Sequence, residues 1–113
     1  MIPIMSEEQF RAFRLALRDE AWSIADDKAR TYASPENRLI NFVRAAERYG
    51  LKPEQSLGMH LGKHMDSIET YIRSGIENRE GVMENIRDAG NYLELLAAMV
   101  HTYKTGSNNS EGV

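Results

Sequence analysis

The chain has 113 residues, no cysteine and a formal net charge of −3 at pH 7. This length fits one domain, and the absence of cysteine excludes disulfides, zinc–thiolate sites and cysteine nucleophiles. The negative charge disfavours binding of a long nucleic acid but allows a small nucleotide, whose charge one Mg²⁺ and a few cations can neutralise. No secretory signal pattern opens the chain and no apolar stretch approaches the length of a membrane span, so we expect a cytoplasmic protein without a membrane partner.

The N-terminal half of the chain predicts two helices. Residues 6–9 read Ser-Glu-Glu-Gln, a capping box, so a first helix should run from about 7 to 30. Its buried face is expected from the residues at helical spacing, which are Phe10, Phe13, Leu17, Ala21, Ile24 and Lys28. Residues 34–36, Ser-Pro-Glu, give a second helix start, and Gly50 can end that helix in the left-handed conformation.

The C-terminal half predicts two longer helices and a tail. Pro53 opens a third helix, residues 76–80 form a polar connection, and a fourth helix should run from about 81 to 104. The expected core face of the fourth helix is formed by Val82, Ile86, Ala89, Leu93, Leu96 and Val100. Residues 106–113 are expected to form a flexible tail on a helical domain of residues 1–105. Four helices with short connections predict an all-α, four-helix bundle-like single domain.

A second apolar stripe on the predicted fourth helix suggests association between copies of the chain. Tyr92, Leu95 and Met99 lie well away from the first stripe at 100° per residue, and a helix that is apolar on two sides needs two layers of cover. Leu15 and Trp22 likewise lie off the main stripe of the first helix. We therefore expect a homodimer or a higher homo-oligomer, most simply with twofold symmetry.

Three oxygen-bearing side chains share one face of the fourth helix. Glu84 and Asp88 are i,i+4, and Asn91 follows Asp88 at i+3. Two carboxylates held together repel each other unless a proton or a cation lies between them, and Mg²⁺ binds such carboxylates together with phosphate oxygens. The alternative is a solvated helix start whose acids interact favourably with the helix dipole.

A second acidic pair, Asp66 and Glu69, lies at i,i+3 on the third helix, and by itself such a pair is usually a solvated face. Asp66-Ser-Ile-Glu69, fourteen intervening residues and Glu84-Asn-Ile-Arg-Asp88 together resemble the MazG-like all-α nucleotide pyrophosphatases. Members of that superfamily carry E-x-x-E on one helix and E-x-x-D on the next, and the four acids bind magnesium. Here Asp66 replaces a glutamate, and the second pair is spaced by four residues rather than three.

The stretch from residue 28 to residue 100 resembles most closely the small phage proteins described as nucleotide-modification-associated domains. The residues that carry this resemblance are Lys28-x-x-x-Tyr32, Asn41-Phe42, Lys63 and Asp88-Ala-Gly-Asn91-Tyr92-Leu. Both resemblances imply an all-α nucleotide-handling protein of phage type, which would act in the host cytoplasm.

The resemblance also implies roles for individual residues. The implied ligands of Mg²⁺ are Glu69, Glu84 and Asp88. Asp66 and Glu69 would be the catalytic residues, with Asp66 orienting an attacking water while the metal polarises the phosphoryl group. The implied nucleotide-binding residues are Lys28, Lys63, Asn91 and Tyr92, the lysines toward phosphates and the tyrosine, or alternatively Trp22, toward the base.

Two functions stay open at this point. One is magnesium-dependent pyrophosphohydrolysis of a nucleoside triphosphate, and the other is a non-enzymatic phage factor that sequesters a nucleotide or binds a host protein. His60 and His64, at i,i+4, are either a metal-binding pair or residues that border the core. The chain has no glycine-rich phosphate loop and no G-x-S-x-G motif, so nucleophilic catalysis has no candidate.

Overall fold

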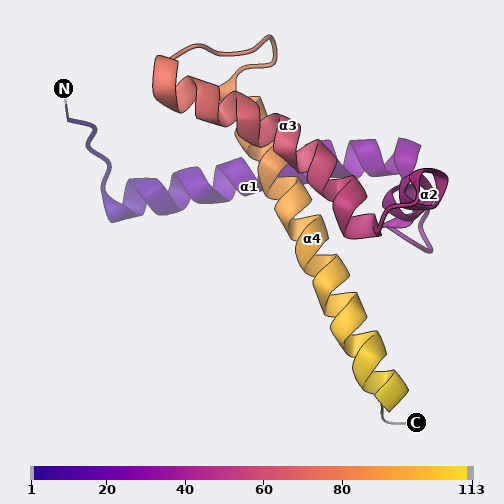
Figure 1. The fold of residues 1–113 in the computed structure, drawn as a ribbon. Coiled ribbons are helices and arrows are strands. Elements are labelled where there is room, and N and C mark those ends of the chain that lie inside the picture. The colour runs from indigo at the N-terminus through magenta and orange to yellow at the C-terminus, as the bar shows by residue number, and fades with distance from the viewer. Residues whose placement is uncertain (1, 112–113) are drawn as a thin grey trace.

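The structure, a computed structural model, describes the backbone of residues 2–111 and the side chains of residues 2–104. It contains four helices, α1 (Glu7–Tyr32), α2 (Ile40–Tyr49), α3 (Pro53–Ser74) and α4 (Val82–Glu111), and no strand among the described residues (Figure 1). The predicted all-α, bundle-like class is therefore confirmed. None of the described helices has an apolar stretch that is long enough to cross a membrane.

The predicted helix ends are largely correct because the capping chemistry is local. The Ser6 hydroxyl accepts from Gln9 N at 3.0 Å, and Gln9 Oε1 accepts from Ser6 N at 2.9 Å, which completes the capping box of α1. Gly50 ends α2 and Gly75 ends α3, with φ values of 68° and 73° in the left-handed region that favours glycine.

The start of the second helix was placed too early. Residues 34–37 form a tight turn in which Asn37 N donates to the Ser34 hydroxyl at 3.0 Å and Ser34 N donates to Asn37 O at 3.3 Å. Ser34 therefore closes a turn instead of capping a helix, as serine often does when a local hydrogen bond competes with helix formation. The helix α2 begins only at Ile40.

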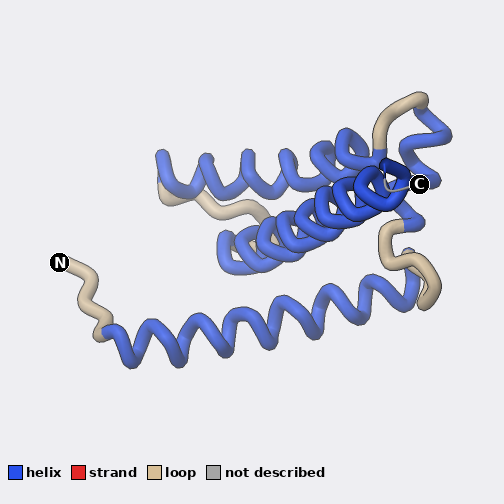
Figure 2. Tube along the Cα trace, turned by 90° about the horizontal axis from the view of Figure 1, so that it is seen from below, coloured by secondary structure: helices blue, strands red, loops and turns tan. Residues whose placement is uncertain are grey.

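The helices pack as two crossing layers. α3 lies along α4 and α2 packs on α3, whereas α1 contacts the rest mainly through α4, which it crosses (Figure 1). Seen from below, α1 forms a layer of its own beneath the other helices (Figure 2). The buried core is small: Phe42, Leu57 and Met99 are its centre, and the flanking side chains are Leu39, Leu61, Tyr92, Leu95 and Leu96.

The α4 stripe expected to face a partner covers the core, while the expected core stripe is only partly buried: Ala89 is 5% exposed and Leu96 packs against the core. Met99, from the stripe expected to face a partner, is 1% exposed, whereas Leu93 and Val100, from the expected core stripe, are 51% and 41% exposed. Both stripes are apolar, so only the placement of α2 and α3 decides which one is covered. α4 also continues to Glu111 instead of ending near residue 104, and the last two residues of the expected tail, 112 and 113, lie outside the described residues.

Candidate functional site

A cavity of about 520 Å³ opens where the four helices meet. It lies within the size range of small-molecule sites. Its walls come from α1, the connection after α1, α2, α3 and α4, and they comprise Ala25, Lys28, Ala29, Tyr32, Ala33, Arg38, Asn41, Phe42, His60, Asp88, Asn91, Tyr92 and Leu95. The lining combines apolar and aromatic side chains with six polar or charged ones, which are Lys28, Arg38, Asn41, His60, Asp88 and Asn91.

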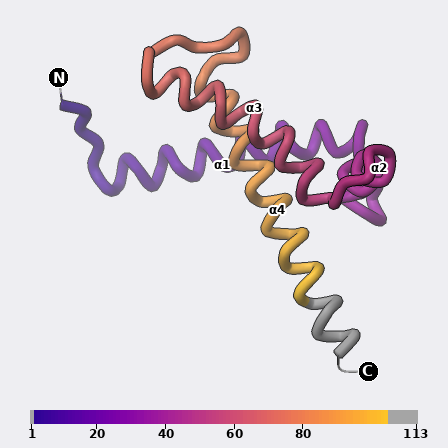
Figure 3. Tube along the Cα trace, in the orientation of Figure 1, coloured from indigo at the N-terminus to yellow at the C-terminus, as the bar shows by residue number. Residues whose placement is uncertain are grey.

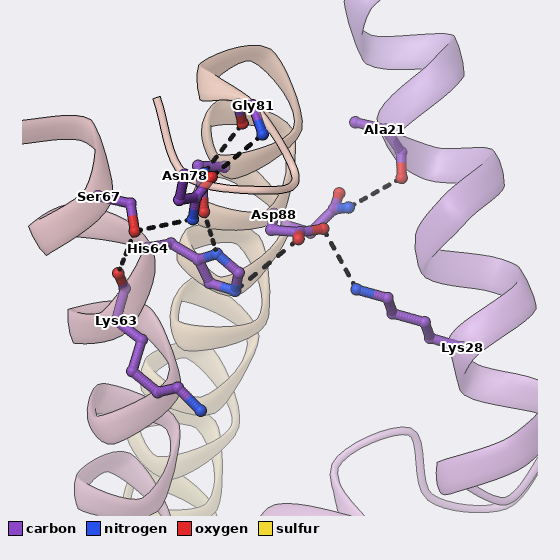
Figure 4. Close-up of polar contacts among 10 residues, drawn as sticks. Ala21, Lys28, Lys63, His64, Ser67, Asn78, Gly81 and Asp88 are labelled. Atoms are coloured by element: carbon purple, nitrogen blue, oxygen red, sulfur yellow. Dashed lines mark hydrogen bonds and ion pairs between the residues drawn. The ribbon is translucent and has the colours of Figure 1, made fainter. Parts of the chain in front are cut away.

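Asp88 is the buried acid of this cavity, with a side chain that is 7% exposed. Its Oδ1 accepts from Lys28 Nζ at 3.3 Å across the α1–α4 crossing, and its Oδ2 lies 3.8 Å from His64 Nε2 on α3 (Figure 4). A buried carboxylate is costly unless it is paired, so these two contacts explain how Asp88 is held at this position. The acid thus joins three helices at the cavity wall.

The imidazole of His64 is oriented by a chain of amides. Asn85 Nδ2 donates to Asn78 Oδ1 at 2.7 Å and to Gly81 O at 2.9 Å. This leaves Asn85 Oδ1 directed at His64 Nδ1, 3.0 Å away, so that nitrogen carries a hydrogen (Figure 4). His64 Nε2 is consequently turned toward Asp88.

An aromatic wall stands beside this polar cluster. The Tyr92 ring stacks on His60 and His64, with centroid distances of 5.8 and 5.5 Å, and Phe42 meets it edge-on at 6.2 Å. Burial, with smaller contributions from Lys63 and His64, lowers the pKa of His60, so its ring is neutral at pH 7. Burial likewise raises the pKa of Tyr92, so its hydroxyl stays protonated.

Two cations line the cavity. Lys28 reaches Asp88 while its side chain remains 51% exposed. Arg38, in the connection before α2, donates from Nη2 to Ala25 O at 3.0 Å, which holds its guanidinium against α1. On the same wall, Asn91 Nδ2 donates to Ala21 O at 2.8 Å and ties α4 to α1.

A smaller cavity of about 240 Å³ adjoins the first and shares Arg38 with it. Trp22 lies on its wall, where the indole Nε1 donates to both carboxylate oxygens of Glu94 at 3.1 Å. Trp22, the alternative aromatic residue for the base, is thus outside the main cavity. Tyr92 is inside it.

Half of the predicted site residues meet in the main cavity. Lys28, Asp88, Asn91 and Tyr92 line it, whereas Asp66, Glu69, Glu84 and Lys63 do not.

The predicted magnesium ligands are not gathered into one site. The Glu69 carboxylate is 62% exposed and lies 4.0 Å from Arg73, while Asp88 contacts Lys28 and His64. Among the described residues, no three His, Asp or Glu side chains form a group that could hold a metal ion. The carboxylates in this arrangement therefore do not fit a shared magnesium site.

Arg38 and Asn85 are the important residues that the sequence patterns did not indicate. Arg38 precedes α2, outside any periodic stripe, and its partner Ala25 lies 13 residues away. Asn85 stands between Glu84 and Ile86 in the acidic motif, and its role depends on the approach of α3 and on the 76–80 connection.

No protein-family model, curated protein or solved structure matches this chain.

Proposed function

We propose that the chain binds a nucleotide in the main cavity. The observation that carries this proposal is the meeting of Lys28, Arg38 and the Tyr92 ring on the walls of one cavity. A nucleotide needs a cationic region for phosphate and a flat apolar surface for the base, and these side chains supply both.

Hydrogen bonding to the base has candidates on the same walls. Asn41 on α2 and Asn91 on α4 line the cavity, and an amide can both donate to and accept from a base edge. Since the Asn91 amide nitrogen already donates to Ala21 O, its carbonyl oxygen is the group left for a ligand. These amides would orient a base that Tyr92 holds by stacking.

The position of the resembling residues supports the same function. All the numbered residues that carry the likeness to the phage nucleotide proteins, except Lys63, line the cavity; these are Lys28, Tyr32, Asn41, Phe42, Asp88, Asn91 and Tyr92. They come from three helices that are distant in the sequence, so their convergence was not implied by their spacing. The origin from a phage and the host cytoplasm remain predictions of the resemblance.

Binding without turnover is the function that the geometry supports best. Magnesium-dependent pyrophosphohydrolysis requires Glu69 and Glu84 to join Asp88 around a metal, whereas Asp88 contacts Lys28 and His64 instead. Hydrolysis stays a prediction of the sequence motif. It is separated from binding by incubation of a triphosphate with the protein and Mg²⁺, because an enzyme releases pyrophosphate or phosphate and a binding protein returns the ligand intact.

The first test of the binding proposal is a thermal-shift screen of nucleosides and nucleotides. A ligand that binds only the folded chain raises the melting temperature by mass action. We expect a rise with at least one nucleotide, and a smaller one with the variant Tyr92→Leu. The control Tyr71→Leu changes an exposed tyrosine of α3 outside the cavity. No rise with any nucleotide or nucleoside would contradict the proposal.

We further propose that the chain forms a homo-oligomer, because it exposes too much surface for a compact monomer. Its accessible area is 8736 Å², whereas a compact monomer of its mass, 12.9 kDa, exposes about 6,300 Å². The excess of about 2,400 Å² exceeds the roughly 800 Å² per partner of a standard interface and suits an obligate one. Its radius of gyration, 17.0 Å, exceeds the roughly 13 Å of a compact chain of this length.

The first half of α1 is the surface that we propose to pack against a second copy of the chain. It extends beyond the other helices at the N-terminal end (Figure 3), and Phe10 and Phe13 are each 43% exposed. The same stripe continues to Ala21, which α4 covers. The exposed phenylalanines therefore extend the apolar face that α1 already buries against α4. A second copy of the chain would cover them.

A further inference from the structure

We infer that the cavity recognises a nucleotide with a single phosphate group, and that Lys28 and Arg38, rather than a divalent metal, neutralise that phosphate. This inference rests on the proposed nucleotide-binding function and specifies its ligand class. It follows from the charges on the cavity wall and from the partners of Asp88.

The charges that line the cavity are few. Lys28 and Arg38 are positive and Asp88 is negative, while the His60 ring is neutral at pH 7 because burial lowers its pKa. The wall therefore carries one net positive charge. A phosphate monoester carries roughly −1.5 to −2 charges at pH 7, so with one bound the net charge of wall and ligand is only about −0.5 to −1. A triphosphate adds two further charged groups for which the cavity wall has no additional cation, so it leaves a larger uncompensated negative charge at the site.

Asp88 holds the lysine in position instead of a metal. Its Oδ1 contacts Lys28 Nζ at 3.3 Å, so this oxygen already has a cationic partner, and its Oδ2 faces His64 Nε2 at 3.8 Å. A Mg²⁺ ion at Asp88 would have to displace the Lys28 ammonium, and neither Glu69 nor Glu84 lines the cavity to complete its coordination. Asp88 is thus a positioning residue, since it fixes Lys28 beside the ligand.

The exposure of Lys28 fits this role. Its side chain is half exposed although Nζ contacts a buried carboxylate, and an ammonium has three donors. One donor can stay on Asp88 while another meets a phosphate oxygen. Arg38 donates through one nitrogen to Ala25 O, and its guanidinium has further N–H donors.

The test is calorimetric titration of the full chain with each common nucleoside 5′-monophosphate, the matching nucleosides and the triphosphates, in EDTA and then in excess Mg²⁺. We expect a monophosphate to bind with the same Kd, within about a factor of two, in both conditions and more tightly than its triphosphate in EDTA. The variant Lys28→Gln should weaken that binding by about tenfold, because it removes a charge-assisted hydrogen bond, and should leave nucleoside affinity unchanged. Lys63→Gln, which removes a lysine outside the cavity, should change neither affinity.

The outcomes are distinguishable. Binding of a monophosphate only with Mg²⁺, or tighter binding of the triphosphate in EDTA, overturns this inference and leaves the proposed function standing. Equal loss of nucleoside and monophosphate affinity in Lys28→Gln also overturns it, because the lysine would then act on the fold. Absence of binding by every compound removes the proposed function as well. The comparison of EDTA with Mg²⁺ uses the unmodified chain, so it decides the question even if the variant does not fold.

Discussion

Lys28 Nζ lies 3.3 Å from Asp88 Oδ1, although the two residues are 60 positions apart in the chain. The pair connects α1 to α4 at the point where the helices cross, and it does so on the wall of the main cavity. Asp88 is also one of the three acids that the family resemblance assigns to magnesium. The structure gives this carboxylate an ammonium partner, and the effect of removing its charge depends on that pairing.

Replacing Asp88 with Asn should destabilise the fold. A carboxylate that accepts from Lys28 and faces His64 contributes charge-assisted hydrogen bonding, and its loss leaves a partly buried cation without its partner. We expect the free energy of unfolding to fall by roughly 1–2 kcal/mol, measured by urea denaturation. If instead Asp88 and Glu84 repelled each other at an empty metal site, Asp88→Asn would be neutral or stabilising.

Asn85→Ala should cost more stability than most polar substitutions. The Asn85 side chain is 3% exposed and makes three hydrogen bonds, to His64, Asn78 and Gly81. Removing it leaves buried partners unsatisfied, so we expect a loss of about 2–3 kcal/mol in chemical denaturation. Asn37→Ala, at an exposed turn, should lose less than half as much. Similar losses in the two variants would mean that the amide chain does not organise the cavity.

Replacing Met99 with alanine should destabilise the fold much more than replacing its neighbour Val100. Met99 is 1% exposed in the core beside Phe42 and Leu57, whereas Val100 is 41% exposed. Met99→Ala should cost about 2–4 kcal/mol in thermal or urea unfolding, and Val100→Ala less than about 1 kcal/mol. The reverse order would restore the core stripe that the sequence pattern alone indicated.

The oligomer should dissociate when glutamates replace the exposed phenylalanines in the first half of α1. In the variant Phe10→Glu/Phe13→Glu, the apolar stripe of α1 would no longer be suited to burial by a second copy. Light scattering should give the mass of an oligomer for the unmodified chain and a lower mass for the variant. The matched control Ile2→Glu/Ile4→Glu alters exposed apolar residues before the helix and should keep the mass of the unmodified chain. A monomeric unmodified chain at micromolar concentration would contradict the proposal.

The helices were predictable because their signals are local. The capping box at Ser6 and the stops at Gly50 and Gly75 depend on a few adjacent residues, and all three are found in the structure. The start at Ser34 failed because a serine followed by proline also favours a turn, and only the chain beyond it decides between the two.

The site was only partly predictable, since its chemistry depends on which helices cross. Asp88, Asn91 and Tyr92, which the sequence motif predicts as site residues, line the main cavity. The motif could not show that Lys28 would reach Asp88, that His64 would stack on Tyr92, or that Glu69 would stay in solvent beside Arg73. These are contacts between helices, and helical periodicity says which residues share a face but not what that face meets.

Metal-independent binding of a nucleotide in the main cavity is tested most directly by a heteronuclear NMR titration. The labelled chain is titrated with the common nucleoside 5′-monophosphates in EDTA. At least one of them should shift the side-chain amide signals of Asn41 and Asn91 and the backbone signals around Lys28 and Tyr92, which line the cavity. The signals of Asp66 and Glu69, on the exposed part of α3, should stay in place. Saturable shifts confined to Asp66, Glu69 and Glu84, or no shift with any monophosphate, would contradict the proposal.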